Sequence, residues 1–236
     1  AMAAKRADAA LLVSSRGELS GILTDNDITR RVISQDLDPE STNVREVMTK
    51  NPKCVRSEDP ALDALDMMVT NRFRHLPVLD KDGAVVGLLD IAKCLYDATA
   101  VLEKIQVNDS ATDALSGAVA DAMKKVSGGR GQNKAQIAAM QAIMTQMFGG
   151  SVPTLRTIIG ESPYVSVSPD TTAREASKCM ANIRKGVLVM DDDGELVGIF
   201  TPKDLLSRVV AKGLSPDDVL VSEVMTPNPD CVAPDL

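Results

Sequence analysis

The sequence contains few aromatic residues, a single histidine and no tryptophan. Aromatic residues make up 2% of its 236 residues, so we expect a core built from aliphatic side chains. The same scarcity excludes an aromatic stacking platform of the kind that binds single-stranded nucleic acid. The net charge of −7, without any basic stripe, argues against a general polyanion binder and leaves room for a local basic pocket. We therefore expect no nucleic-acid partner.

Metal-binding, membrane and catalytic signatures are also missing. None of the four cysteines forms a C-x-x-C pair, which argues against structural zinc and favours reduced thiols in a cytoplasmic protein. No run of about 18 apolar residues is present, so no membrane-spanning helix is expected. Since His75 is the only histidine, no Ser/His/Asp or Cys/His catalytic set is available. We expect a non-catalytic protein without a metal or a covalent cofactor.

One sequence pattern, an apolar strand that turns at once into a helix, occurs three times. The copies lie at residues 17–28, 83–94 and 194–206. In the first and third copies a Thr ends the strand and an Asp follows three residues later; these pairs are Thr24 with Asp27 and Thr201 with Asp204. Such self-similarity is typical of a repeat protein.

A second motif, Val-Met-Thr, follows the first and third copies at a matched distance. As many residues separate Gly21 from Met48 as separate Gly198 from Met225. Alternating and helical apolar patterns between the motifs predict a repeated β-α-β-β-α unit. We therefore expect an α+β fold with small mixed sheets and packed helices.

The repeats divide the chain into five predicted segments. These are unit 1 at 1–36, unit 2 at 44–100, a helical and flexible linker at 101–150, unit 3 at 152–212 and the start of unit 4 at 218–236. Unit 1 lacks its first strand, so one edge of its sheet is expected to be bare or covered by a non-native segment. Residues 230–232 are expected to form an orphan first strand of unit 4. A Met stripe in the linker fits adaptable core, a helix–helix contact or a partner groove.

These motifs together resemble the cystathionine-β-synthase (CBS) domain family, whose domains pair as Bateman modules. The resemblance rests on the three strand-to-helix turns, on the V-M-T-x-x-P pattern from Val47 to Pro52 and on the FRHLPV stretch from Phe73 to Val78. It covers nearly the whole chain apart from about 101–150. The layout is similar to plant and fungal proteins with four CBS domains followed by a Phox/Bem-type domain. The resemblance implies a regulatory module that senses adenosine nucleotides (AMP, ADP, ATP or related) and forms a homodimer through its CBS helices.

The Thr and Asp of the turn allow two chemical interpretations. A Thr hydroxyl beside the free N–H groups of a helix suits a phosphate, and an Asp one turn later can accept from a ribose diol. Alternatively, Thr24 and Thr201 are N-caps, and Asp27 and Asp204 complete capping boxes. In the CBS family the matching residues bind the ribose and phosphate of adenosine ligands. The resemblance therefore favours ligand contacts at both turns, with the turn at Asp204 as the first candidate.

The second copy of the turn departs from this pattern. Asp90 stands in place of the Thr, and Lys93 in place of the Asp. A carboxylate repels a phosphate, and an ammonium group has no acceptor to offer a diol. We expect this cleft to be empty or used differently, with Asp90 paired to Lys93 or capping its helix.

Basic residues recur just before a hairpin strand in each unit. The pairs are Lys5 and Arg6, Arg74 and His75, and Arg184 and Lys185. They either face ligand phosphates or lie in solvated turns, and Lys53 is placed to reach the same cleft. The leading hypothesis is a nucleotide sensor. The alternative is a ligand-independent dimerisation or scaffold module that docks a partner through the helical insertion.

Overall fold

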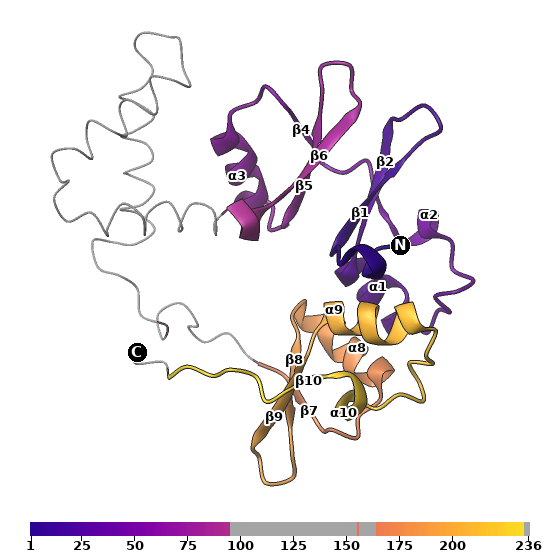
Figure 1. Cartoon of the computed structure of the whole chain (residues 1–236), viewed down its shortest axis with the longest axis vertical. Helices are drawn as coiled ribbons and strands as arrows, with labels where there is room; N and C mark the ends of the chain where they lie inside the picture. Colours follow the sequence, from indigo (N-terminus) through magenta and orange to yellow (C-terminus); the bar gives the residue numbers. More distant parts are fainter. Residues whose placement is uncertain (95–154, 156–163, 234–236) are drawn as a thin grey trace, which may run out of the picture. The chain divides into compact units, whose positions relative to one another are not determined.

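The computed structural model describes residues 1–94, 155 and 164–233 (Figure 1). Residues 1–91 and 163–231 form one compact unit, which contains every element discussed below. Residues 92–162 and 232–236 form a separate unit, and the expected Met-rich helix of the linker lies outside the described residues.

The first sheet has the strand order β1-β2-β3. A hairpin joins β1 (Ala9–Val13) to β2 (Leu19–Thr24), and β3 (Thr49–Lys50) pairs antiparallel with the other side of β2. The helical segments around this sheet are a 3-10 turn at Ala3–Lys5, α1 (Asp25–Arg31), a 3-10 turn at Ile33–Gln35 and α2 (Val44–Val47).

The second sheet has the order β4-β5-β6. β4 (Val55–Arg56) runs parallel to β5 (His75–Leu79), which forms an antiparallel hairpin with β6 (Val85–Asp90). The helix α3 (Ala61–Thr70) connects β4 to β5, as the apolar periodicity of this stretch predicts.

The third sheet has the order β10-β9-β8-β7 and repeats both patterns. Its strands are β7 (Ser166–Val167), β8 (Val187–Met190), β9 (Leu196–Phe200) and β10 (Thr226–Pro227). Its helices are α8 (Ala173–Ile183), α10 (Val221–Val224) and α9 (Pro202–Asp204), which continues as a π-helix at Leu205–Val209 and a 3-10 turn at Val210–Lys212. The expected α+β fold with small mixed sheets is confirmed.

The matched spacing of the two motifs has a packing cause. Met48 lies across Gly21, so that a Cβ atom at Gly21 would come within 2.5 Å of the Met48 sulfur. Gly198 and Met225 make the same close contact. The segment that begins with each Val-Met-Thr motif, at Val47 or Val224, is called the lead-in. Each lead-in pairs with the strand of the preceding turn, β3 with β2 and β10 with β9. The first residue of each lead-in, Val47 or Val224, ends a short helix, α2 or α10, and the extended backbone begins after it.

The first sheet differs from the other two at one edge. β4 and β7 pair in parallel with β5 and β8, whereas no strand in the described residues takes that place beside β1. Its third strand, β3, lies at the opposite edge. Residues 230–232 do not form the expected strand; no described strand pairs with them, and a strand needs such a partner for its backbone groups.

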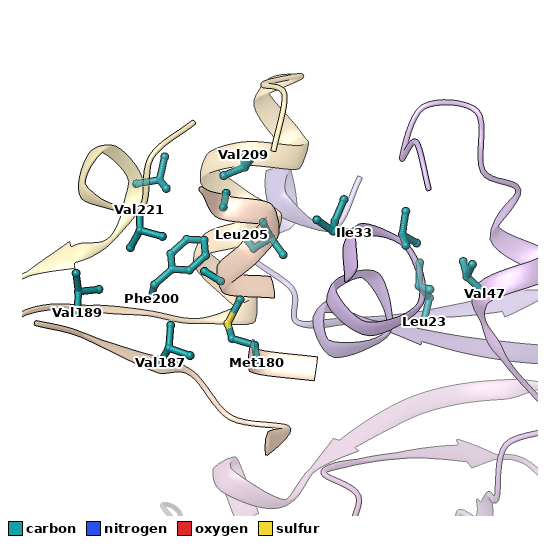
Figure 2. Close-up of a cluster of buried hydrophobic side chains, with 14 residues drawn as sticks. Leu23, Ile33, Val47, Met180, Val187, Val189, Phe200, Leu205, Val209 and Val221 are labelled. Atoms are coloured by element: carbon teal, nitrogen blue, oxygen red, sulfur yellow. The ribbon is translucent and has the colours of Figure 1, made fainter. Parts of the chain in front are cut away.

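A shared hydrophobic core joins the first and third repeat units (Figure 2). Ile33 from the first unit is wholly buried with Met180, Phe200 and Leu205 from the third, where α1 packs against α8. The second unit has a separate, smaller core made by Val55, Ala64, Met68 and Leu76. The cores are mainly aliphatic, as the composition predicts, although the larger one also contains the wholly buried Phe200. Among the described helices, none has the length and apolar character that crossing a membrane requires.

Candidate functional site

The first turn is held by a capping box between Thr24 and Asp27. The Asp27 Oδ2 atom accepts from the Thr24 backbone N–H at 2.9 Å and from the Thr24 hydroxyl at 2.8 Å, and the Asp27 N–H donates to Thr24 Oγ1 at 3.2 Å. The Asn26 N–H donates to Asp25 Oδ1 at 2.7 Å. The helix N–H groups that were expected to be free for a phosphate are therefore already used, because side chains of the turn accept from them.

The third turn repeats this geometry closely. Asp204 Oδ2 accepts from the Thr201 N–H at 3.0 Å and from its hydroxyl at 2.7 Å. In both turns the second carboxylate oxygen faces an Arg one helical turn later, at 3.5 Å from Arg31 in the first and from Arg208 in the third. These arginines also donate to the Val47 and Val224 carbonyls at 2.8 Å. Each Asp is thus a cap that also fixes the following lead-in.

A pocket of about 600 Å3 opens beside the first turn. Thr24, Asp27 and Thr49 contribute polar groups to its wall, and Ile22, Pro52 and Phe73 contribute apolar ones. The pocket joins the end of β2 to the lead-in of the second repeat unit and to the segment that precedes β5. It therefore lies between the first and second units.

The wall of this pocket is strongly basic although the chain is acidic overall. Six cationic side chains line it, against the carboxylates of Asp25 and Asp27; they are Arg30, Arg31, Lys53, Arg72, Arg74 and Arg184. Arg31 faces Asp27, and Arg74 lies 3.5 Å from Asp90. Within the described ranges, no ion pair is found for Arg30, Arg72 or Arg184. The concentration of uncompensated positive charge favours an anionic ligand.

Comparison with known proteins gives the family. The CBS domain family matches residues 44–96 and 157–211. These two stretches of the chain are CBS domains. The chain is 43% identical over 233 residues to CBS domain-containing protein CBSCBSPB3 of Arabidopsis thaliana. The matched region covers 98% of this chain and 40% of that relative. The chain is 31% identical over 248 residues to the Meiotically up-regulated gene 70 protein of Schizosaccharomyces pombe, covering 98% of this chain and 34% of the relative.

A solved structure supports the fold of the CBS units. Protein MJ1225 from Methanocaldococcus jannaschii superposes with a TM-score of 0.55 at 11% identity, covering 95% of this chain and 72% of that one. The chain spans about two fifths of the length of the plant relatives it matches. The family assignment implied by the motifs is thereby confirmed at the level of CBS domains.

The turn of the second CBS unit is occupied by an internal charge cluster. Asp90 ends β6 and lies 3.5 Å from Arg74 Nη2 and 3.9 Å from His75 Nε2. Its contacts thus include Arg74, just before β5, and His75, the first residue of β5, and are not only within its own turn. Lys93 is exposed. Asp90 faces these two basic groups. It also places a negative charge where the other turns carry a neutral Thr.

The pKa values of two titratable groups in the pocket are shifted in opposite directions. Burial lowers the pKa of His75 below its usual value of 6.5, and the Asp90 carboxylate opposes part of that effect. Burial raises the pKa of Asp25, opposed by the Asn26 N–H hydrogen bond and reinforced by Asp8. Burial disfavours the charged form of each group.

The structure gathers most, and not all, of the predicted site residues in this pocket. Those that line it are Thr24, Asp27, Lys53, Arg74, His75 and Arg184. Thr201, Asp204, Lys185, Lys5 and Arg6 do not line it. Sequence reasoning missed Arg30, Arg72 and Asn51, which no motif marks. The sequence did contain a signal for Arg31 and Arg208, because each stands four residues after the Asp of an equivalent turn.

Proposed function

We propose that this chain is a non-catalytic regulatory module that binds an adenosine nucleotide in the pocket between its first and second CBS units. The observation that carries the proposal is the joint presence in one pocket of a ribose acceptor, an apolar wall and several uncompensated cations. These are the three chemical groups that a nucleotide requires. The nucleotides considered are AMP, ADP and ATP, with no covalent cofactor.

Asp27 is proposed to accept from the ribose hydroxyls. A carboxylate has about four lone-pair positions, and the described partners use only part of them. The side chain is 12% exposed and is held by its cap, so that little conformational entropy is lost on binding. Ile22, Pro52 and Phe73 provide the apolar surface against which a flat base would pack.

The phosphates are proposed to lie among the basic side chains rather than at the start of α1. The N–H groups of Asn26 and Asp27 already donate to Asp25 and Thr24, whereas Arg72 and Arg184 have no carboxylate partner in the described part of the chain. Arginine suits phosphate because its planar fork matches the oxygens.

Arg184 gives the proposed site a regulatory consequence. It belongs to the third CBS unit and caps the C-terminal end of α8, the helix that packs on α1 of the first unit. A phosphate that contacts Arg184 would favour the arrangement in which these units are packed together. A ligand shifts such an equilibrium only through its different affinity for the two arrangements.

The proposal is tested by calorimetric titration of the chain with AMP, ADP, ATP and S-adenosylmethionine. We expect saturable binding of at least one of them below millimolar concentration. If the folded chain binds none of them at millimolar concentration, the sensor hypothesis fails.

A ligand-independent dimerisation or scaffold module is the second candidate function. It is favoured by four exposed apolar side chains in the second CBS unit, Leu62 and Val69 on α3 and Val86 and Leu88 on β6. The insertion proposed to dock a partner lies outside the described residues. Light-scattering mass measured with and without nucleotide separates the candidates, since assembly without any nucleotide binding supports the scaffold.

We extend the proposal to the whole protein by analogy with the plant and fungal layout. It then contains four CBS units, with the boundaries predicted from the repeats, followed by a Phox/Bem-type domain, and acts as a cytoplasmic homodimer. In that protein the turn at Thr201 and Asp204, with Lys185 nearby in sequence, would belong to a second module completed by the fourth unit.

A further inference from the structure

We propose that Lys53 makes the pocket selective for nucleotides with more than one phosphate. This inference rests on the proposed nucleotide site and adds the ligand class that the site prefers. It comes from a comparison of two half-sites within this chain, one at Asp27 and one at Asp204, which share their backbone geometry and differ in charge.

Lys53 and Asp230 occupy equivalent positions in the two half-sites. β3 and β10 pair with β2 and β9 in the same way, and each strand is followed by an Asn with a φ of 46°, Asn51 in one and Asn228 in the other. A Pro follows each Asn, and the next residue is Lys53 in the first lead-in and Asp230 in the second. Because the backbone repeats, the exchange reverses the charge at one place in the site.

Lys53 is held at the wall of the pocket by a short chain of hydrogen bonds. Its Nζ atom donates to Asn71 Oδ1, and Asn71 Nδ2 donates to the Met67 carbonyl at 2.7 Å near the end of α3. Lys53 and Asn71 both line the pocket. An ammonium group has three donors, so Lys53 keeps donors for phosphate oxygens while Asn71 restricts where it lies.

At the other equivalent positions the charge differs in both directions: Arg30 adds a cation to the first half-site, and Asp25, which corresponds to Pro202, adds a carboxylate. Arg30 of the first half-site corresponds to Ser207 of the second, and Arg31 corresponds to Arg208. Lys203 adds a cation to the second half-site, yet its Nζ atom lies 2.9 Å from Asp8. The first half-site therefore offers more positive charge to a ligand than the second. Each added phosphate increases the negative charge of a nucleotide, so this difference acts on the number of phosphates.

The test is a comparison of adenosine, AMP, ADP and ATP binding by the parent chain and by the variant Lys53→Asp, which introduces the residue of the other half-site. Calorimetry is done without divalent cations at an ionic strength of about 0.15 M, where charges more than about 8 Å apart are largely screened. We expect the parent to bind ATP at least about tenfold more tightly than AMP, and the variant to lose most of that ratio with little change for adenosine.

Two further variants make the result specific. Lys50→Asp reverses a charge at an exposed residue of β3 that does not line the pocket, and it should keep the parent ratio. Lys53→Gln removes the charge without reversing it and should give an intermediate ratio. Circular dichroism confirms that each variant is folded.

The inference is overturned if the parent binds AMP and ATP equally well, or if Lys53→Asp weakens all four ligands by the same factor. Either result leaves nucleotide binding itself intact. Failure of the parent to bind any of the four overturns the proposed function as well, so the two failures are distinguishable.

Discussion

His75 is the residue whose charge in the pocket depends most directly on pH. It is the only histidine of the chain, and burial lowers its pKa below the usual 6.5. Folding therefore disfavours its protonated form. Its contribution to stability is complete above about pH 6.5 and is lost as the pH falls through that value toward the pKa of the folded state.

The variant His75→Gln should remove this dependence. We expect the free energy of unfolding of the parent to fall between pH 7.5 and pH 5.5 more steeply than that of the variant, since the variant contains no histidine. Urea unfolding at pH 5.5, 6.5 and 7.5 measures both slopes. Equal slopes would show that His75 is as easily protonated in the folded state as in the unfolded one.

The residue types of the site were partly predictable from the sequence. The motif identified Thr24 and Asp27, and the capping geometry was one of the two stated alternatives. Arg74, His75 and Arg184 were marked because basic residues recur before hairpin strands. No sequence pattern identified Arg30 and Arg72, since their proximity in the pocket depends on how the second unit and α1 pack. The motif could not decide between Asp204 and Asp27, because the two turns share the Thr and the Asp, and only the structure shows that Asp27 lines the described pocket.

At the scale of elements, the contact between lead-in and strand defines the repeat. The strands β1 and β5 fit the predicted β-α-β-β-α unit because their apolar runs are bounded by clear turns. The helices α2 and α10 were not predicted, since four residues are too few to show a helical period. The Gly and Met of the two motifs share a spacing because their atoms touch.

Alanine substitution at the three equivalent glycines should separate this contact from general effects. Gly21→Ala and Gly198→Ala place a methyl group on the sulfur of Met48 or Met225, and each should lower the free energy of unfolding by about 1–3 kcal/mol. At Gly87 the nearest atom to an added methyl is 4.0 Å away, so Gly87→Ala is the matched control and should cost well under about 1 kcal/mol. Urea denaturation measures all three, and equal losses would disprove the role of the methionines.

At the scale of the whole described unit, a polar cluster on Arg174 reinforces the core shared by the first and third CBS units. Arg174 donates to the Ile33 carbonyl at 2.6 Å and pairs with Asp217, and it lies 3.6 Å from Asp36. Its side chain is 13% exposed. Residues far apart in the sequence make this cluster, which explains why no local pattern predicted it.

The variant Arg174→Met should destabilise the chain by about 1–3 kcal/mol, because it leaves the Ile33 carbonyl without this donor and breaks the pair with Asp217. Arg16→Met, in the exposed turn between β1 and β2, is the control and should change the unfolding free energy by less than about 0.5 kcal/mol. Thermal unfolding of both variants measures the loss of stability. A loss for Arg174→Met no larger than for Arg16→Met would contradict a stabilising role of the Arg174 cluster.

The central claim is that Asp27 binds a ligand in addition to capping α1, and a matched pair of variants tests it. Asp27 and Asp204 make the same capping box and the same contact with a following Arg, so Asp→Asn should cost similar stability at each. Only Asp27 lines the described pocket. In calorimetric titrations with ATP, we predict that Asp27→Asn weakens binding at least about tenfold, while Asp204→Asn stays within about twofold of the parent. Equal effects of the two substitutions, or none at Asp27, would contradict the account.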